Sequence, residues 1–119
     1  MIAHVVLFQP KPDLDEPARQ GLLDALSAAL REIPSIRRAR IGPRVTHGRP
    51  YEELMAVDYS FAAILEFDSM AGLKMYLNHP AHEQLATRFF ACFEQALMYD
   101  FEVQEGEEGV ASIRDATAR

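Results

Sequence analysis

The chain's densest group of potentially reactive side chains is the run YLNHPAH, from Tyr76 to His82. It holds two of the four histidines, His79 and His82, on either side of Pro80. An imidazole suits general base catalysis near neutral pH because its unperturbed pKa is about 6.5. A tyrosine hydroxyl can stabilise a developing oxyanion by donating a hydrogen bond. These residue types therefore suggest removal of a proton next to a carbonyl group.

Pro80 must divide the surrounding segment into two helices. Ser69 is a suitable N-cap for the first helix, in which apolar residues follow at helical spacing. Pro80 has no backbone N–H and disfavours the helical conformation of His79, so one helix ends here and the next begins. The second helix places His82 on its apolar stripe, whereas His79 is expected to be an N-cap or a surface residue. The other members of that stripe are Leu85, Phe89, Cys92, Phe93 and Ala96.

Three of these assignments have alternatives. His82 is either a general base at a cavity or a hydrogen-bonded core residue, because one sequence shows no partner for it. His4 lies in the apolar run 2–9 and is either a strand residue bonded to a neighbour or part of the cavity wall. His79 and His82 alone, with no third ligand at a telling spacing, are a weak signal for a divalent metal. We therefore predict no metal and no cofactor.

The remaining elements follow from hydrophobic periodicity. Residues 2–9 read as a strand that is apolar on both faces, and residues 14–33 as an amphipathic helix with a capping box at Asp13 and Glu16. Further strands are expected at 36–45, 55–67 and 97–103, with a polar loop at 46–53. The polar residues from 105 onward lack a strong period and are expected to form a flexible tail.

This order of elements predicts an α+β fold. A strand–helix–strand unit repeated twice gives the ferredoxin-like βαββαβ arrangement, a four-stranded antiparallel sheet with helices on one face. The uncovered face of the sheet carries many apolar residues, so another copy of the chain is the expected cover and the protein is expected to be a homodimer.

Composition limits the class of protein. The chain has 119 residues, enough for one domain, and a net charge of −6, which argues against binding nucleic acid or an anionic membrane. No apolar run is long enough for a transmembrane helix, and the start of the chain lacks the basic region of a signal peptide. The single Cys92 cannot form an internal disulfide, and a buried, inert thiol is favoured. The cytoplasm is the expected compartment.

Several features together resemble the stress-responsive α/β-barrel (Dabb) family. They are the opening MIxHVVLF, the helix that ends at Ile33 and Pro34, the strand end LEF at 65–67, the YLNHPAH run, and the final YDF at 99–101. The resemblance implies a Dabb domain over 1–104, followed by the tail at 105–119. It also implies a homodimer whose two sheets form an α/β barrel, with a cavity between each sheet and its helices.

Some relatives in this family are cofactor-free polyketide cyclases. Carried over by position, His82 is the candidate general base and Tyr76 its catalytic partner. His4, Phe61 and Phe89 are the candidate substrate-binding residues. Cyclase-type relatives can carry a histidine where this chain has Phe61 and a tyrosine where it has Leu26, so the cavity implied here is more apolar.

Three functions remain open at this point. The first is a homodimer that binds a small apolar or carbonyl-containing ligand without chemistry. The second is a cofactor-free cyclase or lyase that uses His82 as its general base. The third, a cofactor-independent monooxygenase-like dimer, depends on similarity of fold alone, which is a poor guide to function.

Overall fold

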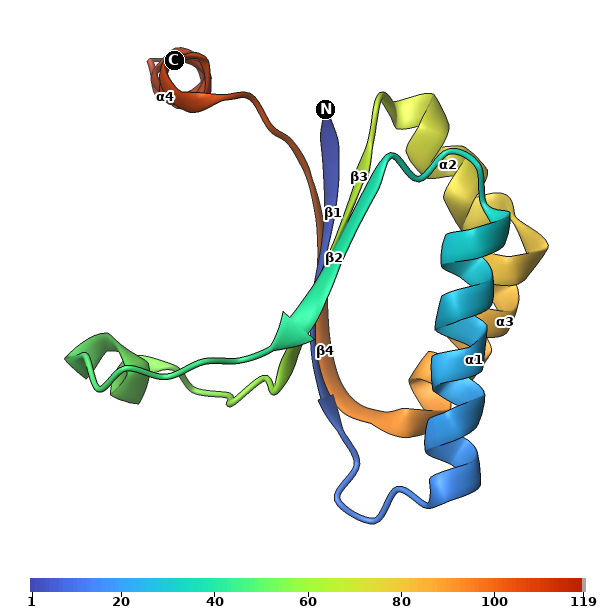
Figure 1. Cartoon of the computed structure of the whole chain (residues 1–119). Helices are drawn as coiled ribbons and strands as arrows, with labels where there is room; N and C mark the ends of the chain where they lie inside the picture. The colour runs from blue at the N-terminus through green and yellow to red at the C-terminus, as the bar shows by residue number, and fades with distance from the viewer. Residues whose placement is uncertain (119) are drawn as a thin grey trace.

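Strand β1 (Ile2–Pro10) lies inside a four-stranded antiparallel sheet with the order β2-β3-β1-β4. The computed structural model describes residues 1–118 and shows a layer of helices on one face of this sheet (Figure 1). The predicted α+β, ferredoxin-like fold is confirmed. The elements after β1 are α1 (Glu16–Glu32), β2 (Arg38–Pro43), the short 3-10 helix η1 (Pro50–Leu54), β3 (Phe61–Phe67), α2 (Met70–Asn78), α3 (Pro80–Cys92), β4 (Phe93–Glu102) and α4 (Gly106–Thr117).

The pairing register sorts the residues of β1 onto two faces. His4 lies opposite Leu65 of β3 and opposite Asp100 of β4. Because side chains alternate along a strand, His4, Val6 and Phe8 share the face that the helices cover. The intervening residues point to the other face of the sheet. Residues 2–8 of β1 are fixed between β3 and β4, whereas Gln9 and Pro10 pair with β4 alone.

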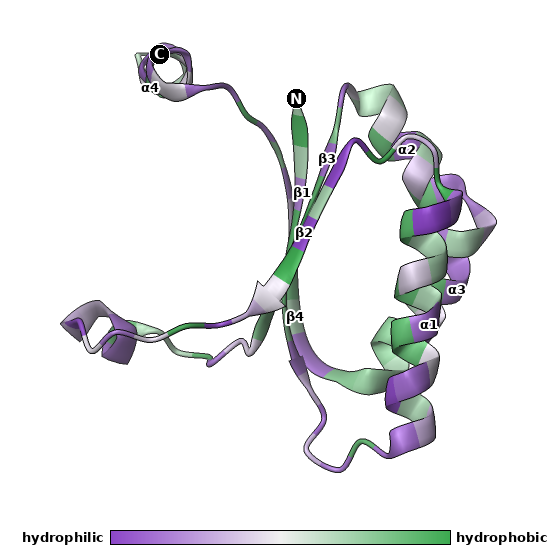
Figure 2. Ribbon diagram, viewed as in Figure 1, coloured by the Kyte–Doolittle hydropathy of each residue, from purple (hydrophilic) through white to green (hydrophobic). Residues whose placement is uncertain are grey.

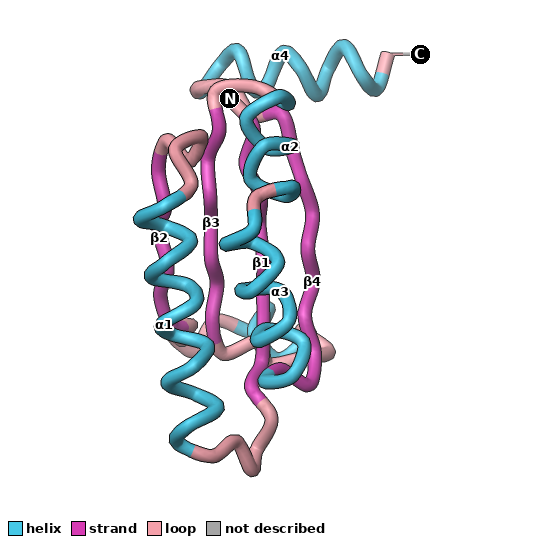
Figure 3. Tube along the Cα trace, turned by 90° about the vertical axis from the view of Figure 1, so that its right-hand side faces the viewer, coloured by secondary structure: helices cyan, strands magenta, loops and turns pink. Residues whose placement is uncertain are grey.

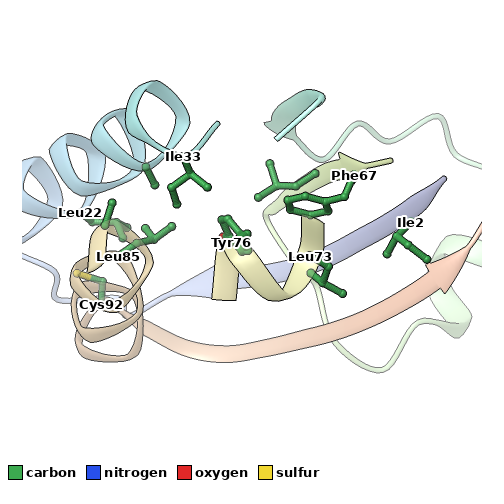
Figure 4. Packing of buried hydrophobic residues seen from close by; sticks show 11 residues of the cluster. Ile2, Leu22, Ile33, Phe67, Leu73, Tyr76, Leu85 and Cys92 are labelled. Atoms are coloured by element: carbon green, nitrogen blue, oxygen red, sulfur yellow. The ribbon is translucent and has the colours of Figure 1, made fainter. Parts of the chain in front are cut away.

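The core lies between the sheet and the layer formed by α1, α2 and α3, which Figure 3 shows in front of the strands. Phe67 is 0% exposed, and its ring lies 5.3 Å from that of Tyr76, measured between centroids. Figure 4 shows this packing. Cys92 is buried, as predicted, and its Sγ donates to the Ala18 carbonyl of α1 at 3.6 Å. The cluster shown in Figure 4 includes Ile2, Leu22, Ile33, Leu73 and Leu85.

Two predicted strand starts, one predicted helix end and one predicted helix cap were wrong. The third strand begins at Phe61 rather than at residue 55, and the fourth begins at Phe93 rather than at residue 97. Helix α3 ends at Cys92, so Phe93 and Ala96 belong to β4 instead of the helical stripe. Helix α1 is capped by Asp15, whose Oδ1 accepts from the Ala18 backbone N at 2.8 Å. Asp15 replaces Asp13 because the helix begins at Glu16, so Ala18 is its third residue.

The segment from residue 105 contains regular structure that the sequence did not predict. Helix α4 spans Gly106–Thr117, and none of its residues is buried. It extends away from the sheet on the side opposite the other helices (Figure 1). The flexibility of the tail at 105–119 stays a prediction.

The sheet face opposite α1, α2 and α3 is apolar. Leu97, Tyr99 and Phe101 of β4 point to it and are exposed. They pair in register with the residues of β1 that point to the same face. Figure 2 shows hydrophobic positions along the strands. Within residues 1–118, no helix has the length and apolar character needed to cross a bilayer.

Phe67→Ala should be strongly destabilising. The substitution leaves a cavity beneath α2 and removes the ring that supports Tyr76, so we expect the free energy of unfolding to fall by about 3–5 kcal/mol. Phe90→Ala is the matched control because the Phe90 side chain is 67% exposed. That variant should lose at most about 1 kcal/mol. Urea denaturation of both variants measures the difference, and equal losses would contradict this account of the core.

Candidate active site

A cavity of about 810 Å³ lies between the sheet and the helical layer. β1 contributes His4, Val6 and Phe8 to its wall, and α2 and α3 contribute Tyr76 and His82. Most of the remaining wall is apolar, including Leu22, Leu26, Phe61, Ala63, Leu65, Leu85, Phe89 and Phe93. A mostly apolar cavity with a few converging polar groups is typical of a small-molecule site.

The polar groups converge around Tyr76. Its ring centroid lies 4.6 Å from that of His82, with an edge-on angle of 63° between the planes. On the other side, the His4 ring lies 5.8 Å from Tyr76. The structure therefore brings together three predicted site residues from three elements, with Tyr76 between the two imidazoles.

The break at Pro80 produces this arrangement. His79 is extended, with φ −76° and ψ 140°, and its Nδ1 accepts from the Ala81 backbone N at 3.0 Å. The predicted role of His79 as an N-cap is thus confirmed. His79 is not among the residues that line the cavity, and residues 1–118 contain no cluster of three or more histidine, cysteine or acidic side chains that could hold a metal.

Asp100 is a site residue that sequence reasoning missed. Its Oδ1 lies 2.7 Å from His4 Nδ1, and the His4 side chain is buried. Because a carboxylate only accepts hydrogen bonds, His4 Nδ1 must donate. The Nε2 of a neutral His4 ring is then left as an acceptor. Alternation along β4 puts Asp100 on the opposite face from Tyr99, and the register places it beside His4.

Burial gives Tyr76 and His82 complementary protonation states. Burial raises the pKa of Tyr76 to about 12, so its hydroxyl remains a donor at neutral pH. The pKa of His82 is lowered, first by burial and then by the charge on a protonated His4. The Leu77 carbonyl and the Glu83 carboxylate raise the pKa of His82 by less than these effects lower it. A neutral His82 is therefore available to accept a proton at neutral pH.

The two predicted substrate-binding phenylalanines lie on the apolar part of the wall. Phe8 lies between them, with ring centroids 5.6 Å from Phe61 and 5.5 Å from Phe89. His47 lies outside the cavity, in the segment between β2 and β3, where its Nε2 lies 2.7 Å from the Tyr51 hydroxyl. This pair is a local loop contact.

Comparison with known proteins identifies the family. The model of the stress responsive A/B barrel domain (Dabb) matches residues 2–103. The chain belongs to the Dabb family. The match ends before α4, so this helix lies outside the family domain. A search of curated proteins gives no match.

Solved structures share the fold of this Dabb chain at low sequence identity. A hydroxynitrile lyase from Passiflora edulis is 18% identical and aligns with a TM-score of 0.73. The alignment covers 88% of this chain and 94% of the lyase chain. A dimeric ferredoxin-like protein of unknown function from Thermobifida fusca is 22% identical with a TM-score of 0.66, covering 86% and 90%. A Dabb family protein from Mesorhizobium loti is 22% identical with a TM-score of 0.67, covering 87% and 97%. At these low identities, the TM-scores establish similarity of fold alone.

His82 should make stability depend on pH. Its folded pKa lies below the unfolded value of 6.5, so the stability it contributes is fully present above pH 6.5. As the pH falls below 6.5, the unfolded chain binds a proton that the folded ring resists, and the free energy of unfolding decreases until the folded pKa is reached. Urea denaturation at several pH values between 7.5 and 5 measures this decrease.

His82→Asn removes the titrating group and should reduce the decrease. His47→Asn is the matched control, since that imidazole lies in the loop outside the cavity. Identical pH profiles for wild type and His82→Asn would show that burial of His82 does not govern this dependence.

Proposed function

We propose that this Dabb protein is a cofactor-free acid–base enzyme acting on a small, largely apolar carbonyl compound. The observation that carries the proposal is the contact between Tyr76 and His82 in the wall of an otherwise mostly apolar cavity. An apolar wall favours a hydrocarbon substrate body, and the two polar side chains supply an acceptor and a donor for its carbonyl end.

In the proposed reaction, His82 removes a proton from the carbon next to the carbonyl. Electrons of the broken C–H bond move into the carbonyl group and form an enolate. The Tyr76 hydroxyl donates a hydrogen bond to the enolate oxygen, which a phenolate could not do. The enolate carbon can then attack a second carbonyl of the same molecule, as in a cyclase, and protonated His82 returns the proton to the new alkoxide.

The reverse direction corresponds to a lyase. His82 would remove the proton from a hydroxyl group, and the neighbouring carbon–carbon bond would break as the carbonyl forms. The electron pair of that bond leaves with the departing carbon, which then takes the proton from His82. The structural neighbour named as a hydroxynitrile lyase supports this direction, because it has a similar fold. Both directions require the same neutral base and the same protonated donor.

His4 and Asp100 would assist as a pair. The hydrogen bond from His4 Nδ1 to Asp100 fixes the imidazole orientation and its tautomer. Burial first, and then any positive charge on His4, lower the pKa of His82. We assign a positioning role to Asp100, since it acts through His4.

We also propose that the protein is a homodimer that pairs through the open face of its sheet. The exposed apolar residues of β4 on that face support this assembly. Some structural neighbours are named as dimeric ferredoxin-like proteins, which supports the same assembly.

His82→Ala should slow proton abstraction strongly. The first step can be followed without knowing the complete reaction by exchange of α-hydrogens for deuterium in D₂O, using a medium-chain β-ketoester and an aryl methyl ketone as probes. We expect a loss of about 10²–10⁴-fold in the catalysed exchange rate, which is the usual contribution of a general base. NMR of the probe measures the rate.

Tyr76→Phe and His47→Ala complete this test. The first keeps the ring contacts but removes the donor, and should slow exchange by about 10²-fold or more while probe binding persists. The second alters a histidine outside the cavity and should leave exchange unchanged. Exchange that survives in His82→Ala, or binding of both probes without exchange in wild type, would leave a ligand-binding protein without this chemistry.

Native mass spectrometry of freshly purified protein should show a dimer. A small organic molecule that is purified with it would identify the chemical class to test next. A monomer at micromolar concentration would contradict the dimer and leave the exchange experiment unaffected.

A further inference from the structure

The wall of the cavity changes in character along its length. On β1, His4 and Phe8 point to the same face of the sheet, about 13 Å apart at the rise of a strand, and both line the cavity. On α3, His82 and Phe89 lie two turns apart, about 10 Å along the axis, and both line the cavity as well. Each of these elements therefore carries a histidine toward one end of the cavity and a phenylalanine toward the other.

Ring contacts between the elements show that the two ends are separate groups. At the polar end, the Tyr76 ring lies 5.8 Å from that of His4 and 4.6 Å from that of His82, measured between centroids. At the aromatic end, the Phe8 ring lies 5.5 Å from that of Phe89. We call this aromatic end the tail subsite, which consists of Phe8, Phe61, Phe89 and Phe93.

Two small side chains lie between the ends. Val6 is midway between His4 and Phe8 on β1, and its partner in the register is Ala63 of β3. Both side chains line the cavity and are buried. Because neither side chain reaches far from the sheet, the cavity of about 810 Å³ continues over them from the polar end to the tail subsite.

The tail subsite lies toward the mouth of the cavity. Lys11 and Pro12, which follow β1, line the cavity and are exposed, and Phe90 lines it with 67% of its surface exposed. At the other end, Tyr76 is 3% exposed and packs against the fully buried Phe67. A substrate whose reactive group is at the polar end therefore has its far end at the tail subsite.

We propose that the substrate is a carbonyl compound with an apolar tail of about eight to ten carbons, and that Val6 and Ala63 leave room for this tail to reach the phenylalanines. The inference rests on the acid–base function proposed above and names its substrate class. The length follows from about 10–13 Å between the two ends and about 1.3 Å for each carbon of an extended chain. A shorter substrate would forgo the affinity that each additional buried methylene supplies.

A series of methyl ketones with propyl, hexyl, nonyl and tridecyl tails tests the length. Exchange of their α-hydrogens in D₂O is followed by mass spectrometry. We expect kcat/KM to rise about threefold for each methylene up to the nonyl tail. It should then level off, because the additional methylenes of the tridecyl tail extend past the mouth into water.

Ala63→Phe tests the route to the tail subsite by placing a ring in the middle of the cavity. We expect the ratio of kcat/KM for the nonyl ketone to that for the propyl ketone to fall about 10²-fold, because the far methylenes are no longer buried. This ratio does not depend on how much of the variant is folded. Ala63→Leu is a smaller obstruction for the case in which Ala63→Phe does not fold, and should lower the ratio about tenfold.

Ala71→Phe is the matched control for Ala63→Phe. It adds the same ring at an exposed position of α2 that does not line the cavity, so the ratio should stay at the wild-type value. Phe89→Ala removes one ring of the tail subsite without obstructing the cavity. This variant should also lower the ratio, by about tenfold, through lost contacts with the end of the tail.

The contrary outcomes separate this inference from the proposed function. Equal kcat/KM for all tails, or a wild-type ratio in both Ala63 variants, would overturn the tail subsite and leave the acid–base function intact. If no ketone exchanges, isothermal titration calorimetry with the same series decides. Affinity that rises with tail length in wild type but not in Ala63→Phe would support the tail subsite while the acid–base function fails. Affinity that does not depend on tail length would overturn both.

Discussion

The arrangement of the site depends on one interruption in a helix. In a continuous α-helix, two residues six positions apart are separated by about 9 Å along the axis and point to different sides. Tyr76 and His82 have this spacing, yet their rings are in edge-on contact. The contact exists because Pro80 ends α2 and starts α3, with His79 as the extended residue between them. Pro80 thus determines, through its effect on the backbone, that the side chains of Tyr76 and His82 come into contact.

Burial then gives the side chains of Tyr76 and His82 different protonation states. Removing a phenol from water disfavours the phenolate, and removing an imidazole from water disfavours the imidazolium. The same apolar surroundings therefore keep Tyr76 protonated and His82 unprotonated at neutral pH. No metal is needed to create a donor and an acceptor side by side. The central strand completes the arrangement, since β1 places His4 within reach of Asp100 on β4 while it also contributes Phe8 to the apolar wall.

Much of this arrangement could be predicted from the sequence, and the exceptions have physical causes. The helix break, the N-cap at His79 and the burial of Cys92 follow from local rules that act within a few residues. The meeting of His4 with Asp100 depends on strand register across 96 residues, which local patterns do not contain. Residues 55–60 alternate like a strand, but they pair with no strand of the sheet. The apolar spacing of α3 continues in the sequence past Cys92, although the helix ends there. Helix α4 was missed because its apolar face is short.

The position of Cys92 makes it a natural probe of the helical layer. Its sulfur lies beneath the carbonyl of Ala18, between α3 and α1, and the residue is 2% exposed. A thiol reagent can reach it only when α1 separates from α3 or when the whole domain unfolds, so its labelling rate reports how often the layer opens. Because the same two helices contribute Leu22, Leu26 and His82 to the cavity wall, that rate also measures access to the cavity through this side. The labelling rate of Cys92 thus reports the opening of the helical layer that forms one wall of the cavity.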